Sequence, residues 1–121
     1  MKKILLIEDD PLIVEIYTAK LKKSGFDIES AIDGKSAFEK FSKKEYDLIL
    51  LDIVLPHLTG FELLERMKRQ KKSKQVKVVV LSNLGEEADI KRAQKMNVVK
   101  YLIKAHHTPS EVVEEIKKIL K

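Results

Sequence analysis

Apolar runs and amphipathic stretches alternate along the 121 residues of this chain. Four of the runs are almost continuously apolar, as strands are when helices cover both faces of a parallel sheet. A fifth run is more polar and suits an edge strand. The pattern therefore predicts five strands, within "KKILLIE" (2–8), "FDIESA" (26–31), "YDLILLD" (46–52), "VKVVVLS" (76–82) and "VKYLIK" (99–104).

Between these runs, apolar residues recur at the three- and four-residue spacing of amphipathic helices. The last helix has the clearest beginning, because Thr108 and Glu111 form a capping-box pattern around Pro109. Five strands, each followed by a helix, predict one α/β domain over residues 1–121, with a parallel sheet and right-handed crossovers. The predicted helices cover 11–23, 34–42, 60–72, 86–95 and 109–121.

An aspartate interrupts the third apolar run, "LILLDIVLP" (48–56). An ionised carboxylate inside an apolar core costs several kcal/mol unless it is paired or bound to metal. Other strands also end in polar residues, and the carboxyl ends of parallel strands share one rim, where ligands bind. We therefore expect Asp52 to face a site at that rim, together with Glu8, Asp9, Ser82 and Lys104.

This set of side chains suits phosphoryl chemistry. Neighbouring carboxylates repel one another, and a divalent cation relieves the repulsion. A site made only of oxygen ligands favours Mg²⁺, the ion that most often accompanies phosphoryl groups. A lysine neutralises a phosphoryl oxygen and a serine hydroxyl donates a hydrogen bond to one. An aspartate beside Mg²⁺ is suited to act as a nucleophile that forms an acyl phosphate.

With these motifs in order, the sequence resembles a response-regulator receiver domain of two-component signalling over essentially its whole length. The resemblance implies a flavodoxin-like (βα)5 three-layer sandwich, whose five-stranded parallel sheet has the strand order 2-1-3-4-5. The stretches that carry it are "ILLIEDDP" (4–11), "LILLDIVLPHLTGFELL" (48–64), "VVVLS" (78–82) and "YLIK" (101–104).

The resemblance assigns a metal-assisted phosphoacceptor role to the acids. Asp52 corresponds to the phosphoacceptor. Glu8 and Asp9 correspond to the acidic pair that binds Mg²⁺, with Asp9 as the direct ligand and Glu8 acting through water. The backbone carbonyl of Val54 corresponds to the third protein ligand. Asp10 is expected to begin the following helix and to point away from the metal.

Three further residues match the family's phosphoryl-binding and switching positions. Ser82 corresponds to the hydroxyl that binds the phosphoryl group, Lys104 to the cation of the site, and Tyr101 to the aromatic switch. The resemblance also implies an output face, which consists of the helix 86–95, the strand 99–104 and the helix 109–121.

Two positions depart from the family's usual pattern. The lysine is usually followed by a proline in a cis peptide bond, whereas Ala105 follows Lys104 here. A non-proline cis bond costs roughly 2.5–4 kcal/mol, so this loop is expected to be strained or rebuilt in trans. The residue after the switch hydroxyl is usually very small. Asn83 stands there in this chain and is expected to crowd the approach of the phosphoryl donor.

The lifetime of the phosphorylated state depends on how water reaches the acyl phosphate. The residues two positions beyond the acceptor and two beyond the switch hydroxyl flank that path, and here they are Val54 and Leu84. Neither apolar side chain can orient an attacking water, whereas many receivers place a polar or acidic residue at one of these positions. We therefore hypothesise a phosphorylated state that outlasts theirs unless a phosphatase acts.

The partners follow from the resemblance. It implies a phosphorylation-switched signalling protein, not an enzyme beyond its own phosphoryl transfer and dephosphorylation. The phosphoryl group would come from a sensor histidine kinase or a histidine phosphotransfer protein. Without an output domain, a stand-alone receiver would signal through its surface to another protein, whose identity the sequence does not give. It would be a monomer or a weak dimer that forms on phosphorylation.

Composition and charge add little to this interpretation. The net charge is +5, there is no cysteine, and neither a signal peptide nor a membrane-spanning run stands out, so we expect a cytoplasmic protein with no membrane partner. The stretch 66–77 carries seven basic residues and no acid. It lacks aromatic residues for base stacking and lies away from the rim, so we interpret it as a solvated helix end that does not bind nucleic acid.

Two other functions do not fit these residues, and a third stays open. Haloacid-dehalogenase-type phosphatases need a second acid two residues after the nucleophile, where this chain has Val54. A flavodoxin-type electron carrier needs a phosphate-binding first loop, and "EDDP" (8–11) would repel a phosphate. A receiver-like protein-binding module that works without phosphorylation stays open because of the altered loop at Ala105.

Overall fold

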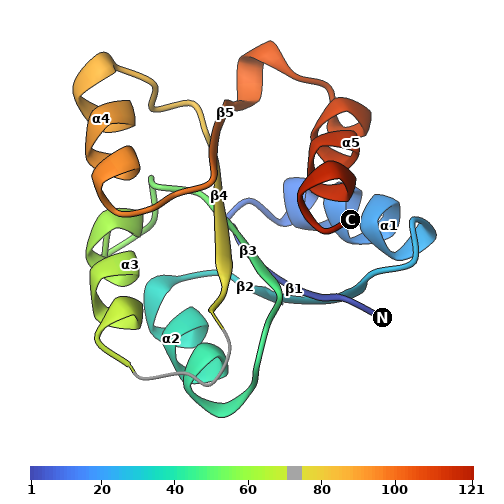
Figure 1. Ribbon diagram of the computed structural model, residues 1–121, viewed down its shortest axis with the longest axis horizontal. Helices are drawn as coiled ribbons and strands as arrows, with labels where there is room; N and C mark the ends of the chain where they lie inside the picture. Colours follow the sequence, from blue (N-terminus) through green and yellow to red (C-terminus); the bar gives the residue numbers. More distant parts are fainter. Residues whose placement is uncertain (71–74) are drawn as a thin grey trace.

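The computed structural model describes residues 1–70 and 75–121. Its centre is a five-stranded parallel sheet with the strand order β2-β1-β3-β4-β5, which confirms the order that the resemblance implied (Figure 1). Each strand is four to six residues long. Polar rim residues follow directly after β1, β3 and β5, and Ser82 is itself the last residue of β4. The strands are β1 (Lys3–Ile7), β2 (Asp27–Ala31), β3 (Leu48–Leu51), β4 (Lys77–Ser82) and β5 (Lys100–Ile103).

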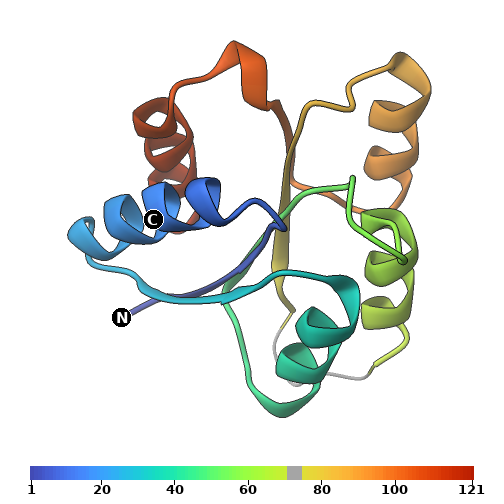
Figure 2. The same cartoon turned by 180° about the vertical axis from the view of Figure 1, so that it is seen from behind.

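Helices cover both faces of the sheet, as the continuous apolar strands predict. Helices α1 and α5 lie on one face, and α2, α3 and α4 lie on the other (Figures 1 and 2). The helices are α1 (Pro11–Lys23), α2 (Gly34–Lys43), α3 (Gly60–Lys68), α4 (Glu87–Lys95) and α5 (Pro109–Ile119), with a short 3-10 helix η1 (Lys104–His106) between β5 and α5. Among the described residues, none of the helices has the length and apolar character that a membrane span requires.

The predicted helices match these bounds closely at their beginnings. The prediction for 60–72 extends too far, because α3 ends at Lys68, and its last two residues lie outside the described part of the chain. The capping box predicted for α5 is present: the backbone N–H of Glu111 donates to Thr108 Oγ1 at 3.2 Å. A second capping box, between Thr59 and Glu62, begins α3 and was not predicted.

The sheet separates two apolar cores, and alternate residues of each strand enter opposite cores. In β3, Ile49 and Leu51 pack on the side of α2, α3 and α4, whereas Leu48 and Leu50 pack on the side of α1 and α5. All four of these side chains are fully buried. Because both faces need apolar residues, the strand shows no polar alternation, and the first polar side chain appears only where the strand emerges from the sheet.

The beginning of α3 lies against the backbone that leaves β3. The N–H of Gly60 donates to the carbonyl oxygen of Ile53 at 2.8 Å. A Cβ atom on Gly60 would lie 2.6 Å from Ile53 Cα and 2.7 Å from the carbonyl oxygen of Asp52. Only glycine fits between this helix and the segment that carries Asp52.

We expect Gly60→Ala to destabilise the fold by about 1–3 kcal/mol, because the added methyl group collides with backbone that cannot rotate away. Gly34→Ala is the matched control, since Gly34 also begins a helix. A Cβ atom there would lie 2.7 Å from Leu58 Cδ2, the end of a side chain that can move. Urea unfolding measures both. Equal losses of stability in the two variants would contradict the backbone clash at Gly60.

Candidate functional site

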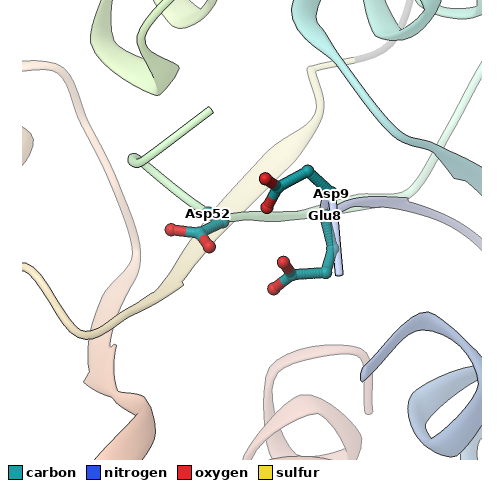
Figure 3. A group of neighbouring side chains, drawn as sticks. All are labelled: Glu8, Asp9 and Asp52. Atoms are coloured by element: carbon teal, nitrogen blue, oxygen red, sulfur yellow. The ribbon is translucent and has the colours of Figure 1, made fainter. Parts of the chain in front are cut away.

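Three carboxylates meet at the carboxyl ends of the central strands. Glu8 follows β1, Asp52 follows β3, and Asp9 extends toward both (Figure 3). One oxygen from each acid lies within 4.8 Å of the others. Glu8 and Asp52 are buried, at 2% and 6% exposure, whereas Asp9 is exposed. The structure therefore places Asp52 beside Glu8 and Asp9, at the carboxyl ends of the strands.

Backbone hydrogen bonds hold the two buried acids in place. The N–H of Glu8 donates to the carbonyl oxygen of Ala31 at 3.0 Å, and that of Asp52 donates to the carbonyl oxygen of Ile7 at 3.0 Å. Both bonds continue the parallel ladders one residue beyond the strands. The register of the sheet thus fixes how closely the two carboxylates approach each other.

Lys104 supplies the positive charge of the site. Its ammonium donates to Glu8 Oε1 at 2.5 Å and to Asp52 Oδ2 at 2.8 Å, and its side chain is 16% exposed. Burial acts to lower the pKa of Lys104, but the hydrogen bonds with Asp52 and Glu8 outweigh it and raise the pKa above its ordinary value. The lysine is therefore charged. The positive charge of this ammonium is smaller than the total negative charge of the three carboxylates when all are ionised.

Burial raises the pKa of the Glu8 carboxyl, and the nearby charge of Asp52 adds to this effect. The hydrogen bond from Lys104 opposes it without cancelling it. An ionised Glu8 is thus costly in this cleft, and a cation beside it would relieve that cost.

Neighbouring backbone groups orient the acids. Asp52 Oδ1 accepts the N–H of Val54 at 3.0 Å, and Glu8 Oε2 accepts the N–H of Asp10 at 3.1 Å. Asp10 itself caps α1, since its Oδ1 accepts the N–H of Leu12 at 3.0 Å. The expectation that Asp10 begins the helix is therefore confirmed, and its carboxylate is committed to that helix rather than to the acidic cluster.

The acids line a cleft of about 390 Å³, together with Val54, Ser82, Asn83 and Lys104. Ser82 is fully buried and ends β4, and its Oγ accepts the N–H of Leu84 at 3.2 Å. Val54 is 58% exposed and stands at the same cleft. The structure thus brings together all of the predicted rim residues, whereas Tyr101, predicted as the aromatic switch, does not line the cleft.

Tyr101 lies on β5, half-buried against the core on the α2, α3 and α4 side. Its hydroxyl donates to the carbonyl oxygen of Leu84, in the loop that follows Ser82. Burial raises the pKa of Tyr101 to about 12, with smaller contributions from the charges of Asp89 and Asp52, so the phenol stays protonated and can donate. Tyr101 therefore contacts the loop that follows Ser82 and does not line the cleft.

The two departures from the family pattern are partners in one hydrogen bond. The Lys104–Ala105 peptide bond is trans, and both residues belong to η1. The N–H of Ala105 donates to Asn83 Oδ1 at 2.9 Å. The sequence pattern alone does not connect the two positions, although each directly follows a residue of the site, Ser82 or Lys104.

The donor set fits a magnesium ion. Glu8, Asp9 and Asp52 offer three carboxylate oxygens in a cleft that opens to solvent, and Mg²⁺ prefers oxygen ligands while keeping several of its waters. Because Asp9 is exposed and both others are buried, an ion bound here would contact protein on one side and water on the other.

The sequence profile of the response regulator receiver domain matches residues 4–117, so the chain belongs to this family of two-component signalling domains. The chain is 33% identical over 120 residues to the alkaline phosphatase synthesis transcriptional regulatory protein PhoP of Bacillus subtilis, covering 99% of this chain and 49% of PhoP. It is 32% identical over 120 residues to the phosphate regulon transcriptional regulatory protein PhoB of Escherichia coli, covering 99% of this chain and 52% of PhoB. The chain thus spans about half the length of these curated relatives.

Solved receiver domains share the fold. A CheY-like receiver domain protein from Methanospirillum hungatei superposes with a TM-score of 0.90 at 25% identity, covering 99% of this chain and 94% of that one. The response regulator TrrA of Thermotoga maritima, in complex with Mg²⁺-BeF, superposes with a TM-score of 0.83 at 30% identity, covering 98% of each chain.

We expect Asp9→Asn to weaken Mg²⁺ binding at least tenfold, because it removes one of the three converging carboxylates. Asp10→Asn is the matched control: it removes the adjacent charge but keeps an acceptor for the α1 cap, so its Mg²⁺ affinity should stay near that of the wild type. Calorimetric titration of Mg²⁺ measures both affinities. A larger loss in Asp10→Asn would show that the ligand set is displaced by one residue.

Proposed function

We propose that Asp52 accepts a phosphoryl group from the phosphohistidine of a sensor histidine kinase or a histidine phosphotransfer protein. The observation that carries this proposal is the contact of Lys104 with both buried acids. It places one ammonium directly on the carboxylate of Asp52, in a cleft that also contains the Ser82 hydroxyl. Membership of the receiver family and the likeness to TrrA, solved with Mg²⁺-BeF, support the proposal.

In the proposed transfer, a carboxylate oxygen of Asp52 forms a bond to phosphorus while the bond from phosphorus to the histidine nitrogen breaks. The leaving nitrogen keeps the electron pair of that bond. The Val54 N–H and the Lys104 ammonium each hold one oxygen of Asp52, so the carboxylate is oriented before the donor arrives.

The remaining polar groups of the cleft stabilise the transferred group in this proposal. Lys104 would neutralise a phosphoryl oxygen, and the Ser82 hydroxyl would donate a hydrogen bond to another. Glu8, Asp9, Asp52 and the backbone carbonyl of Val54 are the residues that would hold Mg²⁺. When bound, this ion would offset the negative charge of the phosphoryl oxygens.

The signal would leave through the face formed by α4, β5 and α5, toward a downstream protein. Two hydrogen bonds support this route. The N–H of Leu84 donates to Ser82 Oγ, and the carbonyl oxygen of Leu84 accepts the Tyr101 hydroxyl. If Ser82 turns toward a phosphoryl group, it loses the Leu84 contact, and the change reaches Tyr101 on β5.

The position of Lys104 weighs against a binding module that works without phosphorylation. Ala105 replaces the usual proline, yet the ammonium still contacts both acids. A module with no use for this chemistry gains nothing from burying two carboxylates and an ammonium, because such groups are costly to desolvate.

We expect Asp52→Asn to abolish phosphorylation by acetyl phosphate in the presence of Mg²⁺, because the amide is a poor nucleophile. Asp33→Asn is the control, since Asp33 caps α2 and asparagine preserves that cap. It should be phosphorylated at the wild-type rate. Phosphate-affinity gel shifts measure both variants. Undiminished phosphorylation of Asp52→Asn would refute the assignment of the acceptor.

Val54 and Leu84, the two residues expected to limit access of water to the acyl phosphate, differ in their positions. Val54 lines the cleft, whereas Leu84 is half-buried and packs against the core. We therefore expect Val54→Asn to speed dephosphorylation by about tenfold, because one added hydrogen bond to the attacking water lowers the barrier by roughly 1.4 kcal/mol. Val54→Ala, which removes apolar bulk without adding a polar group, is the control. Decay of the phosphorylated fraction after donor removal gives both rates, and equal rates would show that Val54 does not control water.

A further inference from the structure

A hydrogen bond joins the loop after β4 to the loop after β5 at the rim of the acidic cleft. The donor is the N–H of Ala105 and the acceptor is the side-chain carbonyl of Asn83, 22 residues earlier in the chain, at 2.9 Å. Because a backbone N–H can only donate, the amide of Asn83 must present its oxygen here. The orientation of this side chain is therefore determined by its partner.

The bond exists only because both residues depart from the usual receiver pattern. A proline in place of Ala105 would have no N–H to donate. A glycine or alanine in place of Asn83 would have no side-chain acceptor. The loss of the usual proline and of the usual small residue thus allows one new hydrogen bond between Ala105 and Asn83.

Both partners sit directly beside residues of the site. Asn83 follows Ser82 and lines the cleft, and Ala105 follows Lys104, whose ammonium contacts Glu8 and Asp52. Apart from the contacts of the Lys104 ammonium, the hydrogen bonds of η1 itself are weak. At its end, the N–H of His107 donates to the carbonyl oxygen of Lys104 at 3.4 Å, which is long for a hydrogen bond, and no side chain caps the beginning of this short helix.

We propose that Asn83 is a positioning residue that holds the loop carrying Lys104, in place of the proline that receivers usually have. Its amide oxygen accepts the N–H of Ala105 and so holds the backbone next to Lys104 in place. From this position the ammonium of Lys104 reaches both Glu8 and Asp52. Without this contact, the loop samples positions in which the ammonium reaches only one of them. The same bond couples the movement of the switch serine to the position of the lysine.

The first test needs neither Mg²⁺ nor a phosphoryl donor and concerns the contact itself. In Asn83→Ala, NMR should show faster exchange of the Ala105 amide with water, by roughly two- to tenfold, the range expected for one hydrogen bond. The ammonium resonance of Lys104 should broaden because its contacts become intermittent. His106→Ala, a truncation of an exposed neighbour in η1, should change neither signal. Unchanged signals in Asn83→Ala would overturn the proposal.

The second test rests on the proposed phosphorylation of Asp52. With acetyl phosphate and saturating Mg²⁺, Asn83→Ala should lower the maximal rate by roughly two- to tenfold, and the donor concentration at half-maximal rate should change little. Adding Ala105→Pro to Asn83→Ala should restore much of the rate, because proline restricts the loop without needing a partner. Faster phosphorylation of Asn83→Ala would show that Asn83 only obstructs the donor, and would overturn the proposal. A wild-type chain that is never phosphorylated would instead refute the proposed function, while the amide and ammonium signals would still decide the role of Asn83.

Discussion

The ammonium of Lys104 is the contact on which the acidic cleft depends. Glu8 and Asp52 are buried side by side, and their mutual repulsion would push the rim apart or protonate one of them if no cation lay between them. The lysine lies 96 residues beyond Glu8 in the chain, in η1, which follows the edge strand β5. The site is therefore complete only when β1, β3, β4 and β5 are all in register. The geometry of the acidic cleft thus depends on the whole sheet.

The strand-end positions of the site were predictable because they follow from the apolar pattern of the strands and from the parallel topology of the sheet. Strands buried on both faces are apolar until they emerge, so the first polar residues after β1 and β3 mark the rim. The pairing of Lys104 was not predictable. The strand-end pattern indicated that the lysine could neutralise a phosphoryl oxygen, but it did not indicate that the ammonium contacts Glu8 and Asp52. That contact depends on the path of η1, which no periodicity encodes.

Loop contacts account for the rest of what the sequence could not give. Val54 and Leu84 looked equivalent as apolar flanks of the water path, yet one lines the cleft and the other turns into the core. Asn83 and Ala105 looked like two separate defects, yet they bond to each other. In both cases the outcome depends on side-chain direction in an irregular segment, where neither helical nor strand spacing applies.

Chemical mapping of the acyl phosphate identifies the residue that accepts the phosphoryl group, which we propose is Asp52. After incubation with acetyl phosphate and Mg²⁺, reduction with borohydride converts a phosphorylated aspartate to homoserine, which mass spectrometry of the digested chain locates. If Asp52 is the acceptor, homoserine appears at residue 52, and its yield falls when Mg²⁺ is withheld. Homoserine at residue 9 or 10 instead, or none at any position in a folded chain, would contradict this proposal.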